Sequence, residues 1–161
     1  MSQRAILDRK ISDLRNAVRQ LQDMHGRQLR LKASAADFYD PLVHHCALAQ
    51  ATQSAHTRLE VLLKDLLALN GESVDDSAAW HRDSLLHCTL DLGEERPPLI
   101  DEDDRRDLLG LLAFRHAVRN AYVHELRIDD VIRHAESAAE TLPRVLARRK
   151  VFVNAFFVPR P

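Results

Sequence analysis

The sequence is poor in residues that interrupt or crosslink a chain. Its 161 residues include four glycines, six prolines and two cysteines, and aromatic residues make up 5%. Cys46 and Cys88 are far apart and form no CxxC motif, so they are read as buried, reduced thiols of a cytosolic protein rather than as a disulfide. The N-terminal residues lack the apolar core of a signal peptide, and no apolar stretch is long enough to span a membrane. We therefore expect a cytoplasmic protein.

The sequence also lacks an excess of charge of one sign. Lys and Arg number 23 against 24 Asp and Glu, which gives a formal net charge of −1. This balance excludes a surface that is basic all over, so any contact with RNA requires a local basic cleft. Hydrophobic residues at 45% and charged residues at 29% are typical of a soluble globular protein. The length fits one domain spanning residues 1–161.

Leu, Ala and Arg dominate the sequence, and their spacing predicts an all-α fold. Leu7, Ile11, Leu14, Val18 and Leu21 form one apolar stripe on a long first helix, and the period is lost over residues 32–40. We expect the second helix to start at Asp40-Pro41 and to stop at Asn70-Gly71. A short third helix opens at Trp80 and ends before Gly93. The prediction is an antiparallel up-down bundle of four main helices plus this short helix.

The second half of the chain carries its own helix signals. Four acidic residues at 101–104 favour the start of the fourth helix, which we expect to extend to about His124. Asp129 or Asp130 can cap the fifth helix, which runs through Leu146, and Pro143 inside it predicts a kink or a break. The apolar tail at residues 151–161 packs back on the body or serves an interface.

The fourth helix is the most informative segment. At 100° per residue, Arg115 projects into an apolar arc that includes Leu108 and Phe114, and Arg119 lies at the edge of that arc. A buried arginine is costly unless it is paired or lines a cleft or a subunit interface. A polar stripe lies beside the arc at four-residue steps and consists of His116, Asn120 and His124.

This set of side chains suits phosphodiester chemistry without a metal. An arginine can hold the scissile phosphate, a histidine can move a proton, and an amide can hold a phosphate oxygen. One helix supplies one edge of a cleft, so we expect a symmetric homodimer to supply the second. The alternatives are that Arg115 pairs with a carboxylate in the core and that the histidines are ordinary surface or interface residues.

Nine histidines raise the question of a metal site. Adjacent or widely spaced pairs such as His44-His45 and His81 with His87 do not share a helix face, and no HExxH motif or zinc-type Cys/His spacing occurs. We expect no bound metal or other cofactor.

The stretch FRHAVRNAYVHELRID, which starts at Phe114, resembles the R-x4-H-x-Y motif of HEPN-domain proteins of the HepT-like toxin branch. Aligned on Arg115, the motif tyrosine is Tyr122 and Asn120 occupies the position of the histidine. A second register pairs Arg119 with His124 but lacks the tyrosine. The flanking segments AWHRDSLL and LIDEDDRRDLLGLLAFRH resemble that branch too. His116, one turn before Asn120, is a further candidate for proton transfer.

The resemblance implies a fold, an activity and partners. HepT-like toxins are HEPN-type helical bundles that act as metal-independent endoribonucleases on cellular RNA such as tRNA or mRNA, and they form homodimers. They are controlled by a minimal nucleotidyltransferase antitoxin that transfers AMP onto the motif tyrosine, here Tyr122, whose alternative role is that of a half-buried core phenol. The alternative function is a catalytically inactive HEPN bundle that binds a nucleotidyltransferase, a nucleotide or RNA.

Overall fold

The computed structural model describes residues 2–34, 40–72, 80–93, 96–120 and 126–157, and all regular structure in these ranges is helical. In chain order, the helices are α1 (Gln3–Ser34), α2 (Pro41–Leu69), α3 (Trp80–Thr89), α4 (Glu102–Asn120) and α5 (Ile128–Phe157). The expected all-α fold is confirmed.

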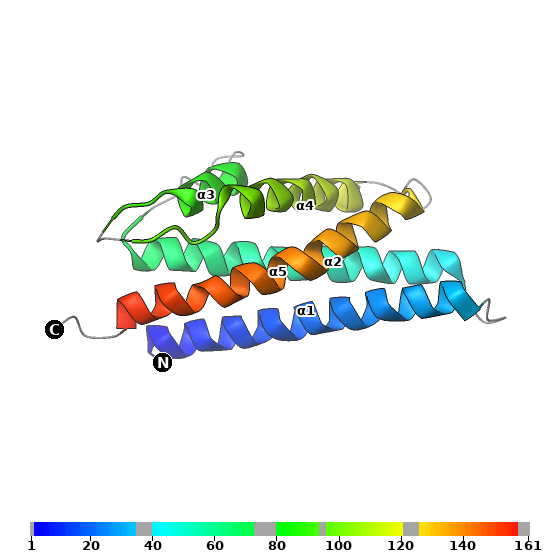
Figure 1. Ribbon diagram of the computed structural model, residues 1–161, viewed down its shortest axis with the longest axis horizontal. Coiled ribbons are helices and arrows are strands. Elements are labelled where there is room, and N and C mark those ends of the chain that lie inside the picture. Colours follow the sequence, from blue (N-terminus) through cyan, green and yellow to red (C-terminus); the bar gives the residue numbers. More distant parts are fainter. Residues whose placement is uncertain (1, 35–39, 73–79, 94–95, 121–125, 158–161) are drawn as a thin grey trace.

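The helices form an antiparallel up-down bundle (Figure 1). Helix α2 runs antiparallel to α1 and to α4, and α5 runs back antiparallel to α4, so that α1 begins and α5 ends at the same end of the molecule. Helix α1 packs against α2 and α5, and α4 packs against the same two helices from the other side. The short α3 packs on α2 and α4. The prediction of four main helices plus a short one is confirmed.

The core is built mainly from leucine. The expected stripe of α1 is buried along its whole length, from Leu7 to Leu21, and it faces a longer row of buried leucines on α2. Each fully buried leucine contributes about 1.5–3 kcal/mol relative to an exposed one. The row on α2 comprises Leu48, Leu59, Leu62, Leu63, Leu66 and Leu67.

Local signals set both ends of α2 and the start of α4 where the sequence predicts them. The carboxylate of Asp40 accepts hydrogen bonds from the backbone N–H groups of Leu42 (2.9 Å) and Val43 (3.3 Å) at the start of α2. After α2, Gly71 adopts a φ of +75°, which is the left-handed conformation that glycine tolerates best. Asp101 caps α4 in the same way, because its Oδ1 accepts from the N–H of Asp104 at 2.7 Å.

Two expectations are wrong in detail, and the structure extends a third. Helix α1 continues to Ser34, beyond the point where the apolar period is lost at residue 32. Helix α5 begins at Ile128, so Asp129 and Asp130 lie in its first turn, where the helix dipole favours acids, rather than at the cap. It also runs through residues 151–157, the first part of the expected tail, and extends well past Leu146.

Pro143 does not break α5, and a contact from α1 explains how the helix continues. A proline has no N–H, so it leaves the carbonyl four residues earlier without its helical partner. That carbonyl belongs to Ala139, and it accepts a hydrogen bond of 3.2 Å from Nε2 of Gln22. The side chain from α1 thus replaces the missing backbone donor.

Two further expectations concern single residues. Both cysteines are free; Cys88 is fully buried as expected, whereas Cys46 is only half-buried because it lies near the exposed start of α2. Helix α4 ends at Asn120, and the expected continuation to about His124 falls on residues 121–125, outside the described residues.

A buried arginine fixes the segment that leads into α4. Arg96 is fully buried, and its Nε and Nη2 donate to the two carboxylate oxygens of Glu72 at 2.6 and 3.0 Å. It also donates to backbone carbonyls, at 2.8 Å to His87 and at 3.3 Å to Leu90 and Pro97. One side chain therefore ties the ends of α2 and α3 to the loop before α4.

We predict that Arg96→Ala lowers the free energy of unfolding by about 3–5 kcal/mol, because it leaves a carboxylate and several buried carbonyls without their donor. The matched control is Arg106→Ala on α4, where an arginine that is 72% exposed pairs with Asp103 at 2.5 Å. The control should change stability by no more than about 0.5 kcal/mol. Urea denaturation measures both values, and equal losses would contradict this description.

Candidate functional site

Helix α4 places its polar residues in two environments. Arg115 is buried with 9% of its surface exposed, whereas His116, Arg119 and Asn120 are exposed. The burial of Arg115 follows from its position on the same face as the buried Leu108 and Leu111. The apolar arc and the polar stripe expected from the sequence are therefore both present over the described part of α4.

Arg115 is paired with a carboxylate, which is one of the alternatives that the sequence leaves open. Its Nη1 donates to Oε2 of Glu60 on α2 at 2.9 Å. Glu60 is itself buried, so both charges are removed from water and depend on each other. The Nε of Arg115 is buried and has no hydrogen-bond partner among the described residues.

The second oxygen of Glu60 binds a histidine from α3. Oε1 of Glu60 lies 2.7 Å from Nδ1 of His81. On α2 itself, Nδ1 of the buried His56 lies 3.6 Å from Oε2 of the same carboxylate. One carboxylate therefore contacts side chains from three helices, and we name this group the Glu60 cluster: His56, Glu60, His81 and Arg115.

His81 is the least buried member of the Glu60 cluster, and further side chains of α2, α3 and α4 lie near it. The ring of His81 meets that of His116 edge to face, with centroids 6.2 Å apart. The ring of His81 also lies against that of Trp80, with centroids 3.7 Å apart, and Nζ of Lys64 lies 4.9 Å from the centroid of the Trp80 ring. A buried polar centre is thus bordered by the exposed His116 and by the half-buried Trp80 and Lys64.

Burial and cationic neighbours together suppress the protonation of two histidines. Burial, with smaller contributions from Arg115, His116, Arg119 and Lys64, lowers the pKa of His81 to about 4. Burial followed by Arg115 lowers the pKa of His56 to about 3. Burial is the larger cause of both pKa shifts, and the neighbouring cations add to it.

The carboxylate experiences opposing effects. Burial raises the pKa of Glu60 to about 7, and the charge of Arg115 opposes that shift. Perturbed titratable groups of this kind concentrate at functional sites, although buried structural ion pairs produce them too. Neither ring nitrogen of His56 has a hydrogen-bond partner of standard geometry within the described ranges.

The structure brings some of the expected site residues together. Arg115, His116, Arg119 and Asn120 share the last part of α4, and the first three act electrostatically on His81. Tyr122 and His124 lie outside the described residues.

Sequence reasoning missed His56, Glu60 and His81 as members of the site. The available signal was a glutamate four residues after a histidine, set among the leucines of the second helix, because an acid on a buried face requires a partner.

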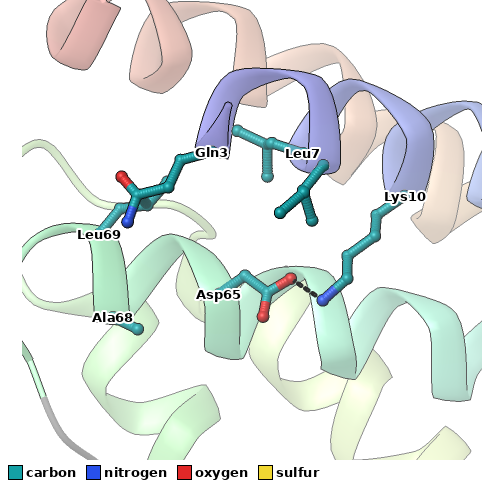
Figure 2. A pocket seen from close by; sticks show the side chains of 7 residues that line it. Gln3, Leu7, Lys10, Asp65, Ala68 and Leu69 are labelled. Carbon is teal, nitrogen blue, oxygen red and sulfur yellow. Dashed lines mark hydrogen bonds and ion pairs between the residues drawn. The ribbon is translucent and has the colours of Figure 1, made fainter. Parts of the chain in front are cut away.

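The structure also has a hollow away from this cluster. It lies between the start of α1 and the end of α2 and is lined by side chains such as Gln3, Leu7 and Leu69 (Figure 2). Its two charged residues, Lys10 and Asp65, form an ion pair with each other. The hollow therefore offers no unpaired charge for a substrate.

The described residues contain neither a metal-binding group nor a membrane-spanning helix. No group of three or more His, Cys, Asp or Glu side chains there has the arrangement of a metal-binding site. No helix in the described ranges combines the length and the apolar character needed to cross a membrane.

Comparison with known families gave one match. The model of a family described as "HepT-like protein" matches residues 47–156, which is more than half of the chain. The matched range includes the last three quarters of α2 and all of α3 and α4, and with them every residue of the Glu60 cluster. Searches of curated proteins and of solved structures gave no significant match.

The low pKa of His56 predicts a specific acid sensitivity. Unfolded His56 titrates near 6.5 and folded His56 near 3, so the unfolded state binds the extra proton between these values and stability falls as the pH falls. From pH 7 to pH 5 this costs about 2 kcal/mol. The free energy of unfolding should therefore fall by about 2 kcal/mol less in His56→Leu than in the wild type when the pH is lowered from 7 to 5.

The control for this experiment is Leu62→Ala, which truncates a neighbouring core residue of α2 without a titratable group. It should lower stability at both pH values and leave the difference between them unchanged. A His56→Leu protein with the same pH dependence as the wild type would show that His56 is not held neutral by the fold.

Proposed function

The chain belongs to the HepT-like family, and on this premise we propose that it is the toxin of a toxin–antitoxin pair and acts as a metal-independent endoribonuclease on cellular RNA. A minimal nucleotidyltransferase is the proposed antitoxin. The proposed active site consists of the end of α4 together with the surface that borders the Glu60 cluster.

The observation that carries this proposal is the set of cations near His81. They come from two helices: Lys64 on α2, and Arg115 and Arg119 on α4. In a chain with a balanced net charge, this grouping of cations supports a local basic surface of the kind that RNA binding requires. The scissile phosphate of RNA is an anion that such a cleft attracts.

We assign separate roles in phosphate binding and proton transfer to the side chains of α4. Arg119 is exposed and can bind a phosphate oxygen directly. Arg115 is buried and bound to Glu60, so it contributes its positive charge without contacting the phosphate. We assign proton transfer to His116 and contact with a phosphate oxygen to Asn120, since an amide can donate a hydrogen bond but cannot act as an acid or base. His124 is a second candidate for proton transfer.

We also propose that the active protein is a homodimer. Helix α4 is one wall of the site, and a two-fold related copy would supply a second wall. In this arrangement the antitoxin inhibits the toxin by transferring AMP to Tyr122. The added AMP is a bulky anion, so it fills the cationic site and repels RNA.

One observation favours a second function. Asn120 occupies the position of the motif histidine when the motif is aligned on Arg115, so a bundle that binds RNA or its nucleotidyltransferase without turnover is the alternative. Both functions use the same surface of α4, and they differ in whether RNA is cut.

We predict that the purified protein cleaves cellular RNA in the presence of EDTA and that its expression without the partner slows growth. Arg119→Ala and His116→Ala should each reduce the cleavage rate by about 10²–10³-fold, through loss of a phosphate contact and of a proton carrier respectively. Gel analysis of a defined RNA and growth curves measure the two effects.

The control for both variants is Arg106→Ala, which removes an exposed arginine from the first half of the same helix. It should leave cleavage and growth arrest unchanged. A wild-type protein that binds RNA or the nucleotidyltransferase but neither cuts RNA nor slows growth would refute the ribonuclease proposal and support the binding bundle.

The AMP transfer has its own test. After incubation with the nucleotidyltransferase and ATP, the intact mass should rise by whole AMP units and RNA cleavage should be lost. Tyr122→Phe should show neither change, since it lacks the accepting hydroxyl. An unmodified wild-type chain, or a Tyr122→Phe chain that still gains mass, would place control of the toxin elsewhere.

A further inference from the structure

We propose that His81, oriented by Glu60, is the base that removes the proton from the attacking 2′-hydroxyl of RNA, and that His116 is the acid that protonates the leaving oxygen. This inference rests on the proposed ribonuclease function and deepens it. It assigns proton transfer to a histidine outside the α4 segment, at a site where Asn120 cannot transfer protons.

The hydrogen bonds around His81 determine which of its nitrogens is available. Nη1 of Arg115 lies 3.4 Å from Nε2 of His81, and arginine can only donate, so Nε2 must carry the lone pair. Nδ1 then carries the hydrogen and donates it to Oε1 of Glu60 at 2.7 Å. Glu60 is therefore a positioning residue that fixes the tautomer, as the carboxylate does in other carboxylate–histidine pairs.

The position of Nε2 suits a base. The side chain of His81 keeps 15% of its surface exposed, and its ring meets the exposed His116 edge to face. The contact from Arg115 is long at 3.4 Å, so a 2′-hydroxyl can displace it. Arg115 retains its shorter bond to Glu60 when that happens.

Every titratable or charged group that faces His81 affects its proton affinity. These groups are His56, Glu60 and Lys64 on α2, and Arg115, His116 and Arg119 on α4. Burial and the cations lower the pKa of His81 to about 4, so the ring is neutral at neutral pH. A bound phosphate introduces negative charge beside the ring and raises its proton affinity when a proton must be accepted.

The proposed reaction is an internal transesterification. The 2′-oxygen attacks the adjacent phosphorus, a bond from O2′ to phosphorus forms, and Nε2 of His81 takes the 2′-hydroxyl proton. The bond from phosphorus to O5′ breaks, and O5′ takes a proton from protonated His116. The products are a 2′,3′-cyclic phosphate and a free 5′-hydroxyl, and solvent returns the two histidines to their starting protonation states.

The test compares His81→Gln and His116→Gln on two substrates. One is an ordinary RNA oligonucleotide, and the other carries sulfur in place of the scissile 5′-oxygen, a leaving group that needs no proton. On ordinary RNA, both variants should lose about 10²–10³-fold in kcat. On the sulfur substrate His116→Gln should recover toward the wild-type rate, whereas His81→Gln should remain impaired, because a base is still required.

Two controls separate chemistry from folding and binding. His87→Gln makes the same substitution on α3, at a histidine beside Glu72 and outside the Glu60 cluster, and it should retain the wild-type rate on both substrates. RNA binding by fluorescence anisotropy and thermal unfolding of each variant show whether a lost rate reflects lost binding or structure. The role of Glu60 is read from Glu60→Gln, which keeps an acceptor oxygen and should retain more kcat than Glu60→Leu.

The outcomes are distinguishable. If the wild type cuts RNA and a folded His81→Gln variant cuts it equally fast, the assignment of the base is overturned and the ribonuclease proposal stands. If the sulfur substrate restores His81→Gln but not His116→Gln, the two roles are reversed and the inference as stated is wrong. A wild type that cuts no RNA overturns the proposed function itself.

Discussion

The interaction on which the rest of the structure depends is the shared use of one buried carboxylate. Glu60 on α2 binds Arg115 of α4 with one oxygen and His81 of α3 with the other. Removing one partner of such a buried group leaves an uncompensated charge, which costs about 3–5 kcal/mol. The short α3 packs on α2 and α4, the same two helices that the carboxylate joins to it. Glu60 thus sets the position of the histidine relative to the cations of α4.

Most of the fold could be predicted because its signals are local. The cap at Asp40 and the left-handed Gly71 act within a few residues of themselves, and they bound α2 where the sequence places it. The error at Pro143 involves a distant residue. Whether Pro143 breaks α5 depends on a donor for the Ala139 carbonyl, and that donor is Gln22 on another helix. The sequence around Pro143 does not indicate that Gln22, more than a hundred positions earlier, supplies this donor.

The candidate site was predictable in part for the same reason. Helical geometry alone identifies Arg115 as an arginine on a buried face and His116 as its polar neighbour, and both placements agree with the structure. The ion-pair partner of Arg115 depends on tertiary packing, because Glu60 lies 55 positions away in the sequence. From the sequence, His81 is a candidate only for a metal site with His87, since its role depends on which helix α3 packs against. The roles of Tyr122 and His124 remain predictions.

In the proposed mechanism, Glu60 holds His81 as a neutral ring. The proton affinity of His81 rises when an anion binds to the cationic surface of α4. Nitrogen-15 NMR of the imidazole tests this directly. In the free protein at pH 8, above the pKa of about 7 of Glu60, we expect Nδ1 to carry the proton and Nε2 to carry none. On addition of an uncleavable 2′-O-methyl oligonucleotide, the Nε2 signal should move toward the protonated form. The account would be contradicted if His81 is already charged in the free protein, or if its signals do not shift when the oligonucleotide is added.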